Sequence, residues 1–260
     1  MSEQGEVIRI RTLNIAHRGA SSLAPENTTA AFDKALEIGA DGLEFDVQMS
    51  KDQIPVIIHD HTLERTTTGH GPVKDLILTD LKSLDSGAWF APQFSGLEIL
   101  TLDEFFERYK YSTLLFDLEL KNELNLYPGL EKTVLRSISE HNLENRIIIS
   151  SFNQDSLLAC SEINPDIRTG LIYRHEIEEP WHYALSLGCY SVHPLFFYLQ
   201  SPETLSAFKR HNLPLYPWTV NDPELMKVFI TENIEAIITD YPQTLKAILD
   251  DYNLPGEGQD

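Results

Sequence analysis

The chain has 260 residues, 42% of them hydrophobic, and a formal net charge of −20. So acidic a chain should repel nucleic acid and anionic membrane surfaces, although a metal ion and a few basic side chains can reverse the field locally and admit a small anionic substrate. The two cysteines, Cys160 and Cys189, form no paired-cysteine motif, which argues against a structural zinc site or a disulfide framework.

The first six residues, Met-Ser-Glu-Gln-Gly-Glu, are polar and acidic. They lack the basic start and apolar core of a secretory signal. In addition, no apolar stretch approaches the roughly 20 residues that a membrane span requires. We therefore expect a cytoplasmic protein with no stable insertion into membranes.

Short apolar runs rich in β-formers alternate along the chain with helical stretches. The predicted strands cover residues 13–16, 42–47, 56–58, 114–120, 147–151, 169–173, 190–192, 215–220 and 236–239. The predicted helices cover residues 28–38, 129–141, 156–163, 202–211, 224–232 and 242–251. This alternation predicts the α/β class and a single (β/α)8 TIM barrel domain over residues 1–260.

Nine predicted strands compete for eight places in such a barrel. Val47 and Pro55 are too close in sequence for a parallel crossover, which needs a dozen or more residues. We therefore interpret residues 56–58 as an excursion that returns over the barrel mouth and carries His59 there. Residues of about 60–102 lack the alternation and predict a small insertion after the second strand, with a short helix near 76–84. A barrel helix is expected near 102–108.

Two acids interrupt the apolar run of the second predicted strand. Glu44 and Asp46 are two residues apart, so in a strand both carboxylates lie on one face. Adjacent carboxylates repel each other and are costly to bury unpaired, and a metal ion is the simplest partner that would hold them together. The run that contains Asp117 and Glu119 repeats this spacing, with Lys121 on the same face.

Further polar residues stand at the predicted strand ends, where barrel enzymes place their sites. These residues are His17, Arg18, Glu119, Lys121, His193, Trp218, Asn221 and Asp240. Each has an ordinary explanation by itself: a histidine at a strand end is more often a loop residue, Lys121 could simply neutralise Glu119, and Trp218 could belong to the core. Asp117 is expected to be a buried, paired structural residue, and His61 a surface residue of a loop. The functional interpretation depends on the coincidence of these residues at one rim.

The ordered set of motifs resembles the glycerophosphodiester phosphodiesterase family from about residue 15 to residue 242. The motifs are His17-Arg18-Gly19-Ala20, Pro25-Glu26-Asn27-Thr28, Glu44-Phe45-Asp46-Val47, Pro55-Val56-Ile57-Ile58-His59-Asp60, Leu63-Glu64-Arg65-Thr66-Thr67, Glu119-Leu120-Lys121, Trp218-Thr219-Val220-Asn221 and Thr239-Asp240. His-Arg-Gly alone is weak, whereas the full set in order is highly specific.

The resemblance implies hydrolysis of glycerophosphodiesters, as small-molecule substrates, to glycerol 3-phosphate and an alcohol. It implies that one divalent cation, Mg²⁺ or Ca²⁺, is held by Glu44, Asp46 and Glu119. It also implies that His17 and His59 are the general acid and base. Arg18 and Lys121 are implied to bind phosphate, and Trp218 is implied to form part of the pocket wall.

The chemistry of these residue types suits those roles. Carboxylates prefer hard cations, basic side chains stabilise the charge of a phosphoryl group, and histidine exchanges protons near neutral pH. The residues leave open which histidine is the acid. They also leave open whether water or a glycerol hydroxyl attacks first, which alcohol is preferred, and how many chains assemble.

Two other functions are compatible with the same sequence. One is a related phosphodiesterase that acts on lysophospholipid or phosphoinositide, which an exposed aromatic or aliphatic rim around Trp89-Phe90 and Phe196-Phe197 would favour. The other is a catalytically silent barrel that binds phosphodiesters. Two histidines and three acids argue against the silent barrel, because binding alone requires neither an acid nor a base.

Overall fold

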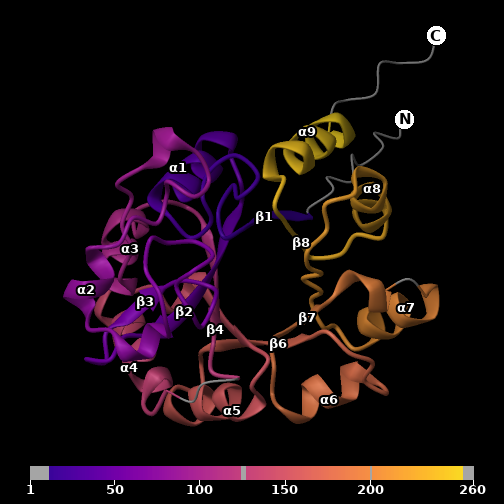
Figure 1. Cartoon of the computed structure of the whole chain (residues 1–260). Helices are drawn as coiled ribbons and strands as arrows, with labels where there is room; N and C mark the ends of the chain where they lie inside the picture. Colours follow the sequence, from indigo (N-terminus) through magenta and orange to yellow (C-terminus); the bar gives the residue numbers. More distant parts are fainter. Residues whose placement is uncertain (1–11, 124–126, 200, 254–260) are drawn as a thin grey trace, which may run out of the picture.

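The computed structural model describes residues 12–123, 127–199 and 201–253 (Figure 1). The acidic N-terminal segment that supports the expectation of a cytoplasmic protein lies outside these residues. Within the described ranges, no helix is long and apolar enough to cross a membrane.

The described strands form one curled sheet. They are β1 (Leu13–His17), β2 (Gly42–Met49), β3 (Pro55–Ile57), β4 (Leu115–Leu120), β5 (Ile147–Ser151), β6 (Arg168–Tyr173), β7 (Ser191–Pro194) and β8 (Ala236–Thr239). The parallel strands follow the order β7-β6-β5-β4-β2-β1-β8, and β3 pairs with β2 alone. Figure 1 shows the strands curling around a common centre, with the helices outside them. The (β/α)8 TIM barrel predicted from the sequence is therefore confirmed.

The barrel is closed by an extended segment rather than by a regular strand at residues 215–220. Tyr216 N donates to Val192 O of β7 at 2.9 Å, and Val220 N donates to Ile238 O of β8 at 3.0 Å. Pro217 has no N–H to donate, which interrupts a regular ladder. The segment nevertheless lies between the two edge strands, β7 and β8, where the seventh of the eight barrel strands was expected.

Helices cover the outside of the sheet. They are α1 (Thr29–Ile38), α3 (Leu102–Tyr109), α4 (Leu130–Glu140), α5 (Gln154–Ile163), α6 (Pro180–Ser186), α7 (Pro202–Arg210), α8 (Pro223–Thr231) and α9 (Pro242–Asn253). Of these, α6 was not predicted. It is short, and its main sequence signal is the proline at its first position.

Local capping explains where α1 begins and ends. The hydroxyl of Thr28 accepts a hydrogen bond from Ala31 N, and Gly39 terminates the helix in the left-handed conformation at φ 79°. Between these caps, α1 presents the buried ring of Phe32 to the sheet. Phe32 and Phe45 both pack against Phe105 of α3, with centroid distances of 5.0 and 4.2 Å. Burying each of these rings stabilises the fold by about 2–3 kcal/mol.

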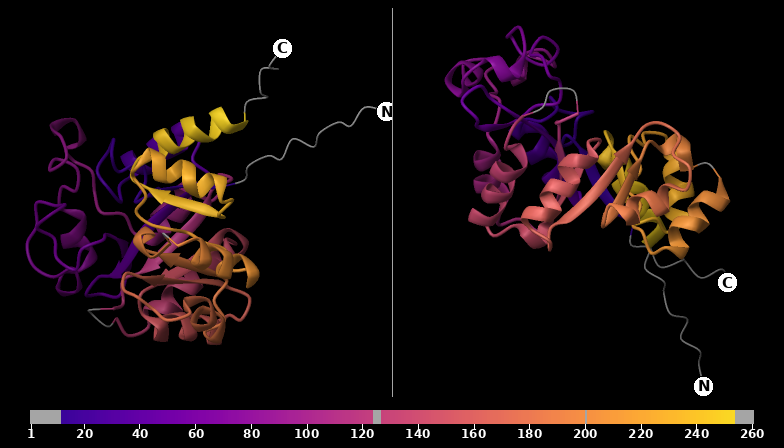
Figure 2. Two further views of the ribbon diagram at one scale, coloured as in Figure 1. Left: turned by 90° about the vertical axis from the view of Figure 1, so that its right-hand side faces the viewer. Right: turned by 90° about the horizontal axis from the view of Figure 1, so that it is seen from below.

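The predicted excursion of residues 56–58 is confirmed by the pairing of β3. This strand runs antiparallel to β2, with Val47 opposite Ile57, and Ile58 N donates to Asp46 O at 3.0 Å. Residues 60–100 then carry only α2 (Leu78–Lys82) and the 3-10 helices η1 (Val73–Asp75) and η2 (Pro92–Phe94). The views of Figure 2 show this stretch projecting from one side of the barrel.

That projecting stretch has an apolar cluster of its own. Its buried members are Val56, Ile58, Leu63, Val73, Leu81 and Ile99. Because two of them, Val56 and Ile58, belong to the β3 excursion, the cluster fastens the stretch to the strand that precedes His59. The packing of the stretch therefore helps to position the residues that follow β3.

Candidate active site

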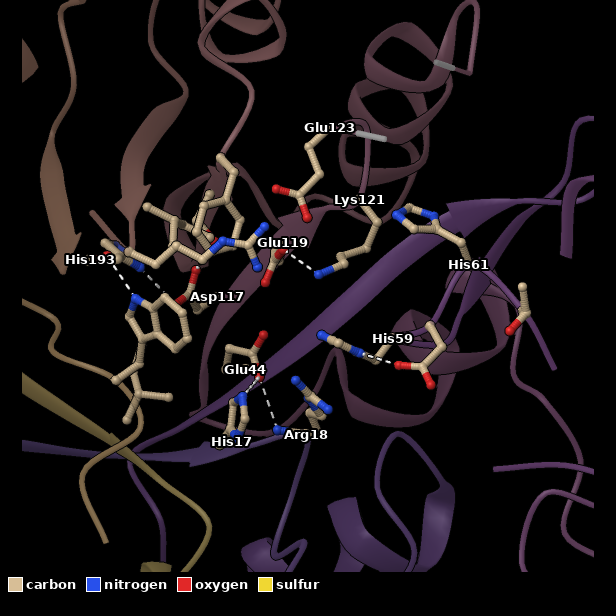
Figure 3. A pocket seen from close by; sticks show the side chains of 18 residues that line it. His17, Arg18, Glu44, His59, His61, Asp117, Glu119, Lys121, Glu123 and His193 are labelled. Atoms are coloured by element: carbon tan, nitrogen blue, oxygen red, sulfur yellow. Dashed lines mark hydrogen bonds and ion pairs between the residues drawn. The ribbon is translucent and has the colours of Figure 1, made fainter. Parts of the chain in front are cut away.

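A cavity of about 360 Å³ opens at the carboxyl ends of the barrel strands. Its lining includes His17, Arg18, Glu44, His59, Asp60, His61, Asp117, Glu119, Lys121, Glu123, Phe152, Arg174, His193 and Trp218. Figure 3 shows the polar members pointing toward a common space from β1, β2, β4 and the loop after β3. Of the residues that the sequence singled out at the strand ends, Asp46, Asn221 and Asp240 do not line the cavity. The structure brings the others to it, from segments as distant as β1 and residue 218.

The backbone after β1 explains why the His-Arg-Gly motif turns where it does. Arg18 has φ 56° and Gly19 has φ 84°, so two successive residues are left-handed and the chain reverses at once. A Cβ atom on Gly19 would lie 2.6 Å from the carbonyl carbon of Ala31. Only glycine fits this close approach to α1. The sharp turn keeps His17 and Arg18 at the cavity.

Strand register brings the three predicted metal ligands together. His17 is paired with Glu44 across β1 and β2, and Asp46 is paired with Glu119 across β2 and β4. One carboxylate oxygen from each of Glu44, Asp46 and Glu119 lies within 4.8 Å of the others. All three residues are buried, with at most 8% of their surface exposed.

Burial and mutual repulsion strongly perturb this acidic triad. Burial, followed by repulsion from Asp46, raises the pKa of Glu44 well above its usual value. Burial likewise raises the pKa of Glu119, to about 7, against the attraction of Lys121. Burial would also raise the pKa of Asp46, but the attraction of Arg18, His59 and Lys121 outweighs it and lowers that pKa below its usual range.

Two cations stand beside the triad, the half-buried Arg18 and the buried Lys121. The backbone N of Arg18 donates to Glu44 Oε2 at 3.0 Å, and its Nε lies 3.2 Å from Asp46 Oδ2. Lys121 Nζ donates to Glu119 Oε1 at 2.7 Å and lies 3.7 Å from Asp46 Oδ1. The two cations offset part of the negative charge. They also offer N–H donors at the cavity, where both residues belong to the lining.

The triad fits a hard divalent cation. Its donor set consists only of carboxylate oxygens, which Mg²⁺ and Ca²⁺ prefer. Asp46 Oδ1 is buried and has no hydrogen-bond partner, although Asn27 Nδ2 donates to Oδ2 of the same carboxylate at 2.8 Å. A bound cation would satisfy that oxygen and remove the repulsion among the three carboxylates.

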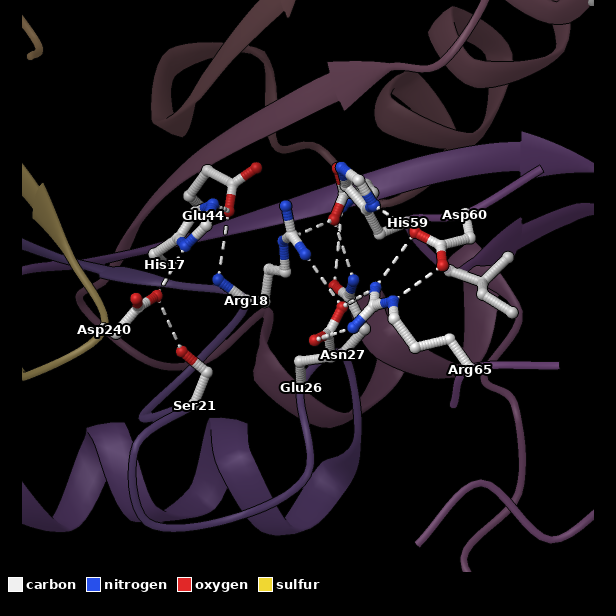
Figure 4. Close-up of polar contacts among 12 residues, drawn as sticks. His17, Arg18, Ser21, Glu26, Asn27, Glu44, His59, Asp60, Arg65 and Asp240 are labelled. Atoms are coloured by element: carbon white, nitrogen blue, oxygen red, sulfur yellow. Dashed lines mark hydrogen bonds and ion pairs between the residues drawn. The ribbon is translucent and has the colours of Figure 1, made fainter. Parts of the chain in front are cut away.

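His17 is held between two carboxylates. Its Nδ1 donates to Asp240 Oδ1 at 2.6 Å, and its Nε2 lies 3.9 Å from Glu44 Oε2. Asp240 is oriented in turn by Ser21, whose hydroxyl donates at 3.0 Å (Figure 4). The amide of Asn221 also donates to Asp240, at 2.7 Å. The network presents Nε2 of His17, and not Nδ1, to the triad.

The network predicts a contribution of Asp240 to stability in acid. Burial would raise the pKa of Asp240, but the hydrogen bond from His17 and those from Asn221 and Ser21 lower it to about 2, against an ordinary value of 3.8. Because the folded pKa is depressed, the stabilisation is complete above pH ~4 and is lost as the pH falls toward ~2.

Asp240→Asn should therefore remove about 1–2 kcal/mol of unfolding free energy at neutral pH, a value reduced for partial solvent screening. The difference from the wild type should shrink below pH ~4. Urea unfolding at pH 7, 4 and 3 measures both effects. A difference that is constant across the three pH values would contradict the assignment.

His59 is arranged in a similar way on the other side of the cavity. Its Nδ1 donates to Asp60 Oδ1 at 2.6 Å. Burial lowers the pKa of His59 below its ordinary value, despite the opposing attraction of Asp46. A neutral imidazole at neutral pH can accept a proton through its remaining nitrogen. Figure 3 shows His59 directed toward the same space as Glu44 and Lys121.

Aromatic side chains form another part of the cavity wall. The Trp218 ring lines the cavity, and its Nε1 donates to His193 O at 2.8 Å. It packs edge-to-face with Phe152, with the ring centroids 5.6 Å apart. Arg174 lies over the Phe152 ring, with its guanidinium carbon 5.0 Å from the centroid. Phe152 and Arg174 were missed from the sequence, although both stand directly after predicted strands, where the strand-end rule could have found them.

Two other expectations have different outcomes. Asp117 accepts from Ser150 Oγ at 2.7 Å and has His193 Nδ1 3.1 Å away, so it is a buried and paired residue, as expected. His61 lies in a loop, as expected, but it is half-buried at the cavity and not on the outer surface. Its Nδ1 lies 3.2 Å from Gln48 Oε1, and the residue lines the cavity because the loop after β3 folds back over β2.

Comparison with known proteins gives one consistent result. The model of the glycerophosphoryl diester phosphodiesterase family matches residues 17–244. A glycerophosphodiester phosphodiesterase of Caldanaerobacter subterraneus is 46% identical over 236 residues, which cover 91% of this chain and 97% of the relative. One of Bacillus subtilis is 32% identical and covers 93% of this chain and 88% of the relative.

Solved structures agree with these matches. A phosphodiesterase of Oleispira antarctica, in complex with the product sn-glycerol-3-phosphate, superposes with a TM-score of 0.80 at 31% identity. The match covers 91% of this chain and 96% of that protein. A glycerophosphodiester phosphodiesterase of Agrobacterium tumefaciens superposes with a TM-score of 0.81 at 28% identity, over 91% of this chain and 99% of the other.

Proposed function

Because the chain belongs to the glycerophosphodiester phosphodiesterase family, we propose that it hydrolyses glycerophosphodiesters with the help of a divalent cation and a histidine pair. It is an enzyme, a phosphodiesterase of that family. The products would be glycerol 3-phosphate and an alcohol. The finer proposal assigns Glu44, Asp46 and Glu119 to the cation, and His17 and His59 to proton transfer.

The observation that carries the proposal is the set of groups at one cavity, which Glu44 and Glu119 line and beside which Asp46 is buried. Three carboxylates within 4.8 Å of one another, two cations and two histidines with carboxylate partners converge at the strand ends. A phosphodiester brings a negative charge that the cations can neutralise. Its hydrolysis also requires a proton donor and a proton acceptor, and a pair of histidines supplies both.

Arg18 and Lys121 would bind the phosphoryl oxygens. Arginine suits bidentate contact with phosphate, and lysine supplies a compact positive charge. When bound, a divalent cation at Glu44, Asp46 and Glu119 would act as a Lewis acid that stabilises charge on the phosphoryl group. Trp218 would form a wall against the organic part of the substrate, with Phe152 beside it.

The two histidines would transfer protons at different atoms of the substrate. One takes a proton from the nucleophile, and the other gives a proton to the departing alcohol oxygen, whose alkoxide is otherwise a poor leaving group. In each histidine the Nδ1 atom is engaged by an aspartate, so Nε2 is the atom that exchanges the proton. The nucleophile can be water or a hydroxyl of the glycerol moiety.

Exposed aromatic side chains make lysophospholipid the second candidate substrate. Trp89 is 41% exposed and Phe197 is 59% exposed, as a lipid-facing rim would require. Neither residue belongs to the lining of the cavity, however, and the net charge of −20 opposes work on anionic lipid surfaces. A small glycerophosphodiester is therefore the substrate that the cavity supports best.

Product analysis of the purified protein tests the proposal. We expect glycerophosphocholine to yield glycerol 3-phosphate, the yield to fall to background with a chelator, and Mg²⁺ or Ca²⁺ to restore it. Phosphocholine as the product would mean cleavage of the other ester bond. Faster turnover of a lysophospholipid would favour the second candidate. Binding without turnover under all these conditions would leave a silent binding barrel and contradict the proposal.

A further inference from the structure

Arg65 links two carboxylates beside the cavity through four hydrogen bonds (Figure 4). Toward Asp60, its Nε donates to Oδ2 at 2.6 Å and its Nη2 donates to Oδ1 at 3.0 Å. Toward Glu26, its Nη1 donates to Oε2 at 2.7 Å and its Nη2 donates to Oε1 at 2.8 Å. Both contacts are bidentate, a geometry that a planar guanidinium can adopt and a lysine cannot.

Each of these carboxylates holds a residue of the proposed site. Asp60 Oδ1 accepts from His59 Nδ1 at 2.6 Å, and Glu26 Oε1 accepts from Arg18 Nη1 at 2.8 Å. A continuous chain of alternating charge therefore runs from His59 through Asp60, Arg65 and Glu26 to Arg18. It connects the loop after β3 with the loop after β1, two segments about 40 residues apart in sequence.

This series of hydrogen-bonded charges restricts side chains that would otherwise be mobile. The side chain of Asp60 is 28% exposed and that of His59 is 30% exposed, so neither is fixed by packing alone. The hydrogen bonds to Arg65 select one orientation of the Asp60 carboxylate. That orientation keeps the proton of His59 on Nδ1 and leaves Nε2 free toward the cavity. Glu26 orients Arg18 in the same way, from the other end.

We propose that Arg65 is a positioning residue of this phosphodiesterase, which holds the Asp60–His59 pair and the Glu26–Arg18 pair in fixed relative orientation. This inference rests on the proposed function, because the proposed function is what gives His59 and Arg18 their roles in the reaction. Arg65 itself is absent from the lining of the cavity, so it acts through its two carboxylate partners.

Arg65→Gln should lower kcat about 10- to 100-fold, the cost of a small displacement of reacting groups, and change KM less than about threefold. Arg65→Lys keeps the charge but not the two bidentate contacts, so its kcat should fall between those of Arg65→Gln and the wild type. Arg108 offers a matched control, because it also makes a bidentate contact on the surface, with Asp33. Arg108→Gln should leave kcat and KM unchanged.

Two comparisons distinguish positioning from other roles. In a double-mutant cycle, the fold-losses in kcat caused by Asp60→Asn and Arg65→Gln should not multiply, because both substitutions break the same series of hydrogen bonds. Millimolar guanidinium should partly restore kcat in Arg65→Ala but leave Arg108→Ala unaffected, since the Arg65 side chain is 44% exposed and its site is accessible. A higher KM with unchanged kcat in Arg65→Gln, multiplying effects in the cycle, or wild-type kinetics would each overturn the inference.

A readout independent of turnover separates this inference from the proposed function. Nitrogen-detected NMR of the histidine rings should show one tautomer for His59 in the wild type, with the proton on Nδ1. The signal is assigned from its absence in a His59→Gln variant. Arg65→Gln should shift the ring toward a tautomer mixture, whether or not the protein hydrolyses a given diester. An unchanged His59 signal would overturn the positioning role, whereas a wild type without turnover would contradict only the proposed function.

Discussion

Replacing His59 by alanine is expected to lower kcat for glycerophosphodiester hydrolysis by about 10²–10⁴-fold, and His17→Ala is expected to do the same. Each histidine supplies a proton transfer that water performs poorly at neutral pH. In both rings an aspartate engages Nδ1, so the alanine variants lose an oriented group rather than a freely moving one. Single-turnover and steady-state kinetics with glycerophosphocholine measure the loss.

The fold of these variants should persist, because both imidazoles lie at the cavity and not in the apolar core. Thermal unfolding checks this point. His182 provides a control, since it is an exposed surface histidine that contacts only Glu179 among the ion pairs of the described residues. His182→Ala should keep wild-type kcat. Rates like those of the wild type in either His17→Ala or His59→Ala would refute the proposed acid-base pair.

The second large expected effect is stabilisation by a divalent cation at the acidic triad, which can be measured by thermal unfolding as well as by activity. Adding Mg²⁺ or Ca²⁺ at about 100 times its dissociation constant should stabilise the wild type by ~2.7 kcal/mol, which raises Tm by about 5 °C. Glu119→Gln should abolish this rise and reduce turnover to near background. A glutamine oxygen can still accept from Lys121, so the change mainly removes a charge.

The same variant has an opposite effect on the metal-free protein. Burial and repulsion within the triad raise the pKa of Glu44 well above its usual value and that of Glu119 to about 7, so the ionised cluster is destabilising without a cation. Glu119→Gln should therefore unfold at an equal or higher temperature than the wild type in the presence of chelator. A lower Tm under those conditions would contradict the repulsion argument.

Asp117 provides the matched control for this experiment. It lies on the same strand as Glu119, two residues earlier, but it is paired with Ser150 and His193. Asp117→Asn should lower stability and still respond to the cation with a rise in Tm. Loss of the response would make Asp117 a ligand and would require a different donor set.

Much of the site follows from local rules that the sequence expresses directly. The two-residue period of a strand places Glu44 and Asp46 on one face, and the short gap between Val47 and Pro55 allows only an antiparallel return. The return of β3 and the helix ends at Thr28 and Gly39 agree with these rules. Where local rules were weak, prediction failed, as with the short helix α6 and the place of the loop residue His61 at the cavity.

Other features depend on packing between distant residues. Pairing of β2 with β4 sets Asp46 opposite Glu119, and the closure of the barrel brings Asp240 to His17 across 223 positions of sequence. The contact of Arg65 with Glu26 arises because the loop after β3 folds against the loop after β1. These contacts cannot be predicted from the two-residue period of the strands or from the amino-acid composition.

The sequence by itself thus determined the acids, histidines and cations of the proposed site and the chemistry they can perform, because alternation, capping and crossover length are local geometric constraints. The tertiary structure alone decided which of those side chains touch. Strand register and the meeting of loops result from burying one shared core, to which residues far apart in the chain contribute. The acidic triad was therefore foreseeable as a set of residues, whereas the aspartate partners of the two histidines and the link through Arg65 were not.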